Sequence, residues 1–274
     1  MKRAALLCLL LAGCAAQPSA KGGGIVSLNP CADAMLVELV PRDRIAAISH
    51  YSRDPGATSI PLDLARKFNV NNGTAEEIIA LRPDLAIIDS FASVSTREAL
   101  TRAGVKTLTL GWANTIEDSR KQVRELAAAL DAKPAGEAMV AKIDGAITAA
   151  RTGRPPVSAL LWIGGNTVNG ANTLLDEMMV KAGFSDHAAH YGLQGTGYLP
   201  IEHVVADPPR VMLVPDQAGR DAASRAAQMR GWALARSGAT VHQAPFERSL
   251  VNCGGPVIPR AMTRLAEIRS EVGQ

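Results

Sequence analysis

The sequence predicts an α/β protein of two Rossmann-like lobes, each with a mostly parallel sheet, joined by a single long helix. Short apolar runs of strand length alternate with helical segments along most of the chain. The alternation stops at a helical segment over residues 132–154, which ends in the break Gly153-Arg154-Pro155-Pro156, and then restarts. A chain of 274 residues is long enough for two modest hydrophobic cores.

The first lobe is predicted over residues 25–131. The helix that begins after Thr74 has Glu77 three residues on, which is the spacing of a capping box. It is expected to end before Pro83, because proline disfavours helical geometry in the preceding residue. We expect strands at 25–28, 44–49, 84–88 and 106–110, and helices at 32–40, 74–82, 96–103 and 116–130.

The linking helix is predicted over residues 132–154, with Pro134 in the first turn, where proline is tolerated. The second lobe is predicted over residues 155–274. We expect strands at 157–163, 210–214 and 240–243, and helices at 174–182, 200–206, 222–230 and 256–272. Two lobes joined in this way leave a cleft between them, which is the expected ligand site.

The first 14 residues read as a lipoprotein signal peptide. Two basic residues precede an apolar run over 4–12, which is too short to span a bilayer as a stable helix. The run ends in Leu11-Ala12-Gly13-Cys14, which resembles a bacterial lipobox, so we expect a lipidated Cys14 to anchor the chain to a membrane. Residues 15–24 would form a tether. Ordinary cleavage after Ala16, with loss of the cysteine, is the open alternative.

Composition and motifs exclude several classes of function. The formal net charge is only +3 and falls when the signal peptide is removed, so no nucleic-acid partner is expected. His187 and His190 have ligand-like spacing, but no third ligand is evident nearby, so we expect neither a metal site nor a resident cofactor. An exported lipoprotein hydrolase is the alternative from a different class. It would need a Gly-x-Ser-x-Gly elbow, which the sequence lacks, so the chain is not expected to be an enzyme.

Cys8 leaves with the signal peptide and Cys14 takes the lipid, so Cys31 and Cys253, one near each end of the processed chain, are the cysteines left to pair. An oxidising exported compartment permits a disulfide between them. Their spacing in the sequence does not show whether their Cα atoms lie close enough, so two separate thiols are the open alternative.

Residues 25–33 (IVSLNPCAD), 45–55 (IAAISHYSRDP) and 73–85 (GTAEEIIALRPDL) resemble the helical-backbone, class III periplasmic substrate-binding proteins. Residues 170–183 and 198–202 are similar to the second lobe of that family. These proteins serve ABC importers of vitamin B12, iron–siderophore complexes and heme. The resemblance implies a metal-chelate ligand, with a corrinoid as the first choice and a ferric siderophore or heme as the alternative. It also implies an ABC transporter permease as partner and a periplasmic, membrane-anchored location.

The resemblance also implies roles for individual residues. Glu76 and Glu202 match two docking glutamates that pair with arginines of the permease; alternatively, each only complements a helix N-terminus. Tyr51 follows a strand at the end where α/β proteins bind ligands, and its ring can stack on a flat macrocycle. The predicted ligand-binding residues are Cys31, Tyr51, Asp89, Trp162, Tyr198 and Cys253, and a core position is the open alternative for Trp162.

Overall fold

The computed structural model describes residues 23–215 and 240–272, together with residues 228, 231, 235 and 238. The predicted signal peptide, Cys14 and most of the tether lie outside the described residues, as does most of the helix expected over 222–230. Within the described ranges, every helix is too short or too polar to cross a bilayer.

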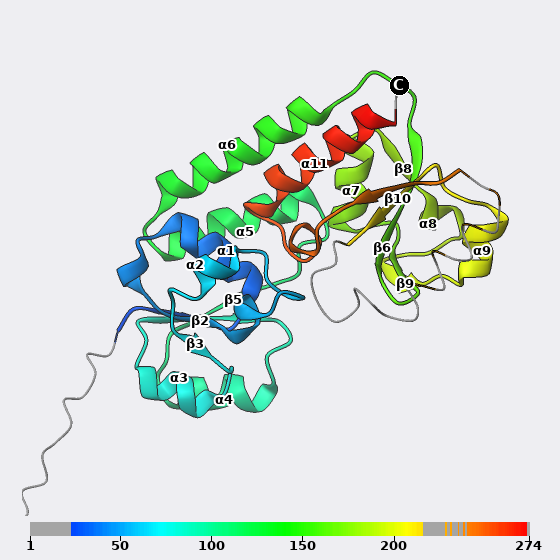
Figure 1. The fold of residues 1–274 in the computed structure, drawn as a ribbon. Helices are drawn as coiled ribbons and strands as arrows, with labels where there is room; N and C mark the ends of the chain where they lie inside the picture. The colour runs from blue at the N-terminus through cyan, green and yellow to red at the C-terminus, as the bar shows by residue number, and fades with distance from the viewer. Residues whose placement is uncertain are drawn as a thin grey trace, which may run out of the picture.

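The first lobe is built on a five-stranded sheet of order β3-β2-β1-β4-β5, in which all neighbouring strands are parallel (Figure 1). Its strands are β1 (Ile25–Ser27), β2 (Ile45–Ser49), β3 (Val70–Asn71), β4 (Leu85–Asp89) and β5 (Thr107–Leu110). Its helices are α1 (Pro30–Leu39), α2 (Leu62–Ala65), α3 (Ala75–Leu81) and α4 (Val94–Arg102), with 3₁₀ turns η1 (Arg42–Arg44) and η2 (His50–Arg53).

The central strands of this sheet are buried on both faces. Successive strand residues point to opposite faces, so Ile25 of β1 packs into the cluster that contains α1, whereas Val26 packs with Ile78 of α3 and Leu100 of α4. Burial on both faces explains why β1, β2 and β4 are mostly apolar, whereas the edge strand β5 alternates exposed threonines with leucines.

Three helices form a layer between the lobes: α5 (Ile116–Ala129), α6 (Lys133–Ala150) and α11 (Val257–Glu271). The linking helix α6 packs against the other two, and Figure 1 shows α11 lying along it. Gly136 permits close approach of α5 and α6, since a Cβ there would lie 2.5 Å from Cβ of Ala127. One apolar cluster runs from the first lobe through this layer into the second. The helix that links the lobes is therefore supported on both sides.

The second lobe has a six-stranded sheet of order β11-β10-β6-β7-β9, with β8 paired to β6. Its strands are β6 (Val157–Gly164), β7 (Thr167–Asn169), β8 (Phe184–Asp186), β9 (Thr196–Tyr198), β10 (Val211–Val214) and β11 (His242–Pro245). Its other elements are α7 (Leu174–Lys181), α8 (His187–His190), α9 (Ile201–Ala206) and the 3₁₀ turn η3 (Arg248–Leu250). Strand β7 pairs antiparallel with both β6 and β9, and the remaining pairs are parallel. The predicted two-lobed α/β fold is confirmed.

Candidate ligand-binding site

A cavity of about 720 Å³ lies between the two lobes, within the range of ~300–1,000 Å³ typical of small-molecule sites. The first lobe contributes the turns that follow β1, β2, β4 and β5. The second lobe contributes the end of β7, the start of α7, part of β9 and residues 251–254. Parallel strands expose their carboxyl ends at one edge of a sheet, and this edge of the first lobe faces the cavity.

Three aromatic rings of the first lobe line the cavity and are strongly exposed: Tyr51 by 50%, Phe91 by 74% and Trp112 by 67%. Phe91 and Trp112 form an edge-to-face pair with ring centroids 5.9 Å apart. Exposed aromatic surface of this kind marks a place where an apolar or flat molecule binds.

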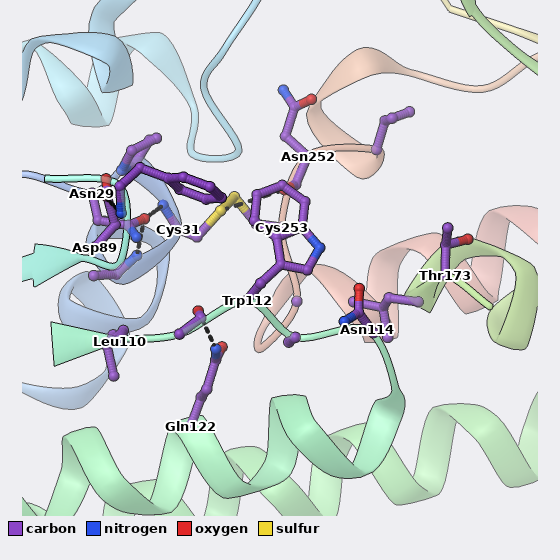
Figure 2. A pocket seen from close by; sticks show the side chains of 18 of the residues that line it. Asn29, Cys31, Asp89, Leu110, Trp112, Asn114, Gln122, Thr173, Asn252 and Cys253 are labelled. Atoms are coloured by element: carbon purple, nitrogen blue, oxygen red, sulfur yellow. Dashed lines mark hydrogen bonds between the residues drawn. A yellow bond between two sulfur atoms is a disulfide. The ribbon is translucent and has the colours of Figure 1, made fainter. Parts of the chain in front are cut away.

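Hydrogen bonds hold the loops that carry two of these rings. Asp89 Oδ1 accepts a hydrogen bond of 2.7 Å from the backbone N–H of Phe91. Gln122 of α5 donates from Nε2 to the carbonyl of Gly111 over 2.6 Å, directly before Trp112 (Figure 2). The positions of Phe91 and Trp112 at the cavity are thus fixed by the chain around them.

Cys31 and Cys253 form a disulfide at the cavity wall, with their Cα atoms 5.1 Å apart (Figure 2). The bond joins α1 of the first lobe to the segment before α11. Gly255 follows with φ of +59° and donates its N–H to Ser119 Oγ over 2.7 Å. At Gly254 a Cβ would lie 2.5 Å from the same Ser119 oxygen. The sequence Cys-Gly-Gly therefore fits closely between α1 and α5.

The polar part of the wall consists mainly of side-chain amides. Asn29 uses its Oδ1 to cap α1, and Asn252 uses its Nδ2 to reach the carbonyl of Ala57 at 3.2 Å. Asp89 is the one charged side chain among the described residues that line the cavity. Such a wall offers uncharged donors and acceptors. The amide residues are Asn29, Asn114, Gln122, Asn169, Asn172 and Asn252.

Four of the predicted ligand-binding residues, Cys31, Tyr51, Asp89 and Cys253, line the cavity. The prediction for Trp162 is wrong, because its side chain is 0% exposed in the core of the second lobe and its Nε1 donates to the carbonyl of Gly165. Strand residues alternate between faces, and the next residue of β6 lines the cavity instead.

Tyr198 is not among the residues that line the cavity, so its prediction also needs correction. Its ring is 66% exposed at the end of β9, and its Oη accepts a hydrogen bond from Asn166. Thr196, two residues earlier on the same face of the strand, lines the cavity.

The two predicted docking residues are exposed on opposite lobes. Glu76 lies in the first turn of α3 and Glu202 in the first turn of α9. Within the part of the chain that the structure describes, neither forms an ion pair, so both carboxylates are open to a partner. Their docking role stays a prediction.

Sequence reasoning missed Phe91, Gln122 and Thr173 as cavity residues. Phe91 follows the strand predicted over 84–88 by three residues, and that position was a usable signal. Gln122 lies within a long amphipathic helix, where its sequence context resembles that of any exposed residue, so no pattern points to it.

An interlobe cavity between two α/β lobes defines a two-lobed binding protein. A model of the periplasmic binding protein family matches residues 25–235. The chain therefore belongs to the periplasmic binding protein family, and the resemblance noted in its sequence is confirmed. No curated protein sequence matches it.

Solved structures share the fold. The periplasmic heme-binding protein RhuT from Roseiflexus sp. RS-1 is 22% identical, with 92% of this chain and 100% of that chain covered and a TM-score of 0.70. A periplasmic heme-binding protein from Pseudomonas aeruginosa is 22% identical, with coverage of 89% and 91% and a TM-score of 0.71. The periplasmic vitamin B12-binding protein BtuF of Vibrio cholerae is 18% identical, with coverage of 91% and 97% and a TM-score of 0.66.

Proposed function

We propose that this protein is a periplasmic solute-binding lipoprotein that binds a corrinoid and delivers it to an ABC importer. The observation that carries the choice of ligand is the chemistry of the cavity wall, which combines three exposed aromatic rings with side-chain amides. A corrinoid is a large metal-bearing ring with amide side chains. Its ring face suits Tyr51, Phe91 and Trp112, and its amides suit the amides of the wall.

The amides of the wall offer both a donor and an acceptor to the amide groups of a ligand. With its Oδ1 engaged at the start of α1, Asn29 presents its Nδ2 as a donor. With its Nδ2 engaged at the carbonyls of Gly56 and Ala57, Asn252 presents its Oδ1 as an acceptor. Both residues line the same cavity, so one amide-bearing ligand can contact both.

Heme is the alternative ligand, and two observations favour it. The proteins RhuT and its Pseudomonas aeruginosa counterpart, which share the fold, are heme-binding proteins by name. Tyr51 presents an exposed phenol at the cavity, and a tyrosine oxygen can ligate heme iron. Charge favours the corrinoid, because the two heme propionates would meet Asp89 and no cationic side chain among the described lining residues. A ferric siderophore with net negative charge meets the same obstacle.

Delivery follows from the family. Its members bind solutes and do not convert them, so no turnover is expected. A lipid on Cys14 would hold the protein at the periplasmic face of a membrane. Glu76 and Glu202 would then present the loaded lobes to arginines of the permease.

The test is direct. Purified protein is incubated separately with cyanocobalamin, heme and ferric siderophores, desalted, and examined by visible spectroscopy. We expect cyanocobalamin to remain with the protein at a ratio near one to one. Retention of heme with loss of cyanocobalamin would transfer the assignment to heme, and retention of none of the probes would refute a metal-chelate ligand.

A further inference from the structure

Asp33 is a fully buried carboxyl group beneath the first-lobe wall of the cavity, and the site described above does not use it. It follows Cys31 by two residues on α1. Residues two apart on a helix face different directions, so Cys31 faces the cavity whereas Asp33 faces the sheet. Asp33 Oδ2 accepts two hydrogen bonds, one of 2.6 Å from Ser52 Oγ and one of 2.9 Å from the backbone N–H of Ser49.

These two partners stand on either side of Tyr51. Ser49 is the N-cap residue of the 3₁₀ turn η2, and its hydroxyl also accepts a hydrogen bond of 3.3 Å from the N–H of Tyr51. Ser52 lies in the same turn and is 0% exposed. A single carboxylate oxygen therefore holds both sides of the short turn from which the ring of Tyr51 projects into the cavity.

A buried carboxyl group at position 33 lowers the stability of the folded protein unless hydrogen bonds compensate for its burial. Burial raises the pKa of Asp33 to about 7, although hydrogen bonds from Ser27, Ser52 and Ser49 act in the opposite direction. Its second oxygen, Oδ1, has no hydrogen-bond partner of normal geometry among the described residues. Buried polar groups that are only partly satisfied cost free energy. The two short hydrogen bonds to the turn are the compensation that the structure shows.

We propose that Asp33 is a positioning residue of the ligand site, which fixes η2 so that the ring of Tyr51 faces the bound ligand. The proposal rests on the proposed function, since it requires that Tyr51 contacts the ligand. Asp33 itself touches no ligand and acts through Ser49 and Ser52. This positioning role explains why α1 carries an acidic residue on the face that packs against the apolar sheet.

Three variants test the proposal with cyanocobalamin and heme as probes. Asp33→Ala removes both hydrogen bonds and should weaken binding of the retained probe at least about tenfold. Ser52→Ala removes one of them and should weaken binding severalfold. Asp33→Asn keeps an oxygen that can accept both and should bind within about threefold of the wild type. Near-normal binding by Asp33→Asn would show that the residue acts by accepting the two hydrogen bonds and that its negative charge is not required.

A matched control comes from the second lobe. Asp186 is a largely buried acid whose pKa burial raises to about 6, and its Oδ1 accepts a hydrogen bond from the N–H of Ala188 at the start of α8. It does not line the cavity. Asp186→Ala should lower the melting temperature and leave the dissociation constant unchanged. Equal losses of affinity in Asp186→Ala and Asp33→Ala would show that destabilisation alone weakens binding, and would overturn the proposal.

A second measurement needs no ligand. Amide hydrogen exchange of Tyr51 and Ser52 should accelerate in Asp33→Ala and in Ser52→Ala but not in Asp33→Asn, while exchange in α11 stays unchanged. If the wild type binds neither probe, the proposed function fails, and this measurement still decides whether Asp33 holds the turn. Unchanged exchange in Ser52→Ala refutes the proposal even if Asp33→Ala does not fold.

Discussion

Removal of the Cys31–Cys253 disulfide should lower the free energy of unfolding substantially. The two cysteines are 222 residues apart, so the bond closes most of the processed chain into one loop. The chain-entropy relation for a loop of this length gives about 5 kcal/mol, and native disulfides are typically worth ~2–5 kcal/mol. The native state should survive the loss, because Asn252 still contacts Ala57, and Gly255 still contacts Ser119 across the same interface.

The assay is urea unfolding of the oxidised protein, the reduced protein and a Cys31→Ala/Cys253→Ala double variant. The urea concentration at the unfolding midpoint should fall in both the reduced protein and the double variant. The slope of the free energy of unfolding against urea rises on loss of the disulfide only if the unfolded chain expands. Reductant should leave the double variant unchanged, which controls for effects on the rest of the chain. A difference below about 1 kcal/mol between oxidised and reduced protein would refute the reasoning.

Three further predictions follow from the same geometry. For Asp33, a pKa of about 7 in the folded state against ~3.9 unfolded means that the stability it contributes is present below pH 4 and falls by about 1.4 kcal/mol per pH unit up to pH 7, roughly 4 kcal/mol in total. Asp33→Asn should lack this fall in urea titrations from pH 4 to 8, and equal pH profiles would contradict the assignment. Phe91→Ala and Trp112→Ala should each weaken ligand binding about tenfold by calorimetry, through lost stacking and contact area; an effect in neither would remove the aromatic wall from the site. Glu76→Ala/Glu202→Ala should abolish ligand uptake by cells while the dissociation constant of the purified protein stays the same, and a lost affinity would reverse the docking assignment.

Most of the architecture could be predicted from local signals. The helix after Thr74 is capped as expected and ends at Arg82, which takes a left-handed conformation before Pro83. Only half of the predicted capping box forms, because Glu77 accepts its hydrogen bond from the N–H of Asn72 instead of the N-cap residue. The antiparallel strands β7 and β9 were missed, since three-residue strands carry too few residues for a periodic pattern.

The candidate site was less accessible to prediction than the fold. The stretch of β6 from Ala159 to Ile163 is apolar at every position, so its sequence does not show that Trp162 faces the core and Ile163 the cavity. The disulfide depends on the distance between residues at opposite ends of the chain, which no local pattern encodes. Asp33 has partners on other elements, and its burial emerges only from the packed structure.

The contacts between the lobes also bear on how a ligand enters. Helices α5, α6 and α11 share one apolar cluster with both lobes, and the disulfide adds a covalent tie at the cavity wall. Wide opening would have to disrupt this core and the contacts of Asn252 and Gly255 with the first lobe. The lobes are therefore held at nearly constant separation, and binding free energy is not consumed by a large closure. Selectivity among ligands should then be decided by the side chains that line this preformed cavity, above all by the exposed rings of Phe91 and Trp112.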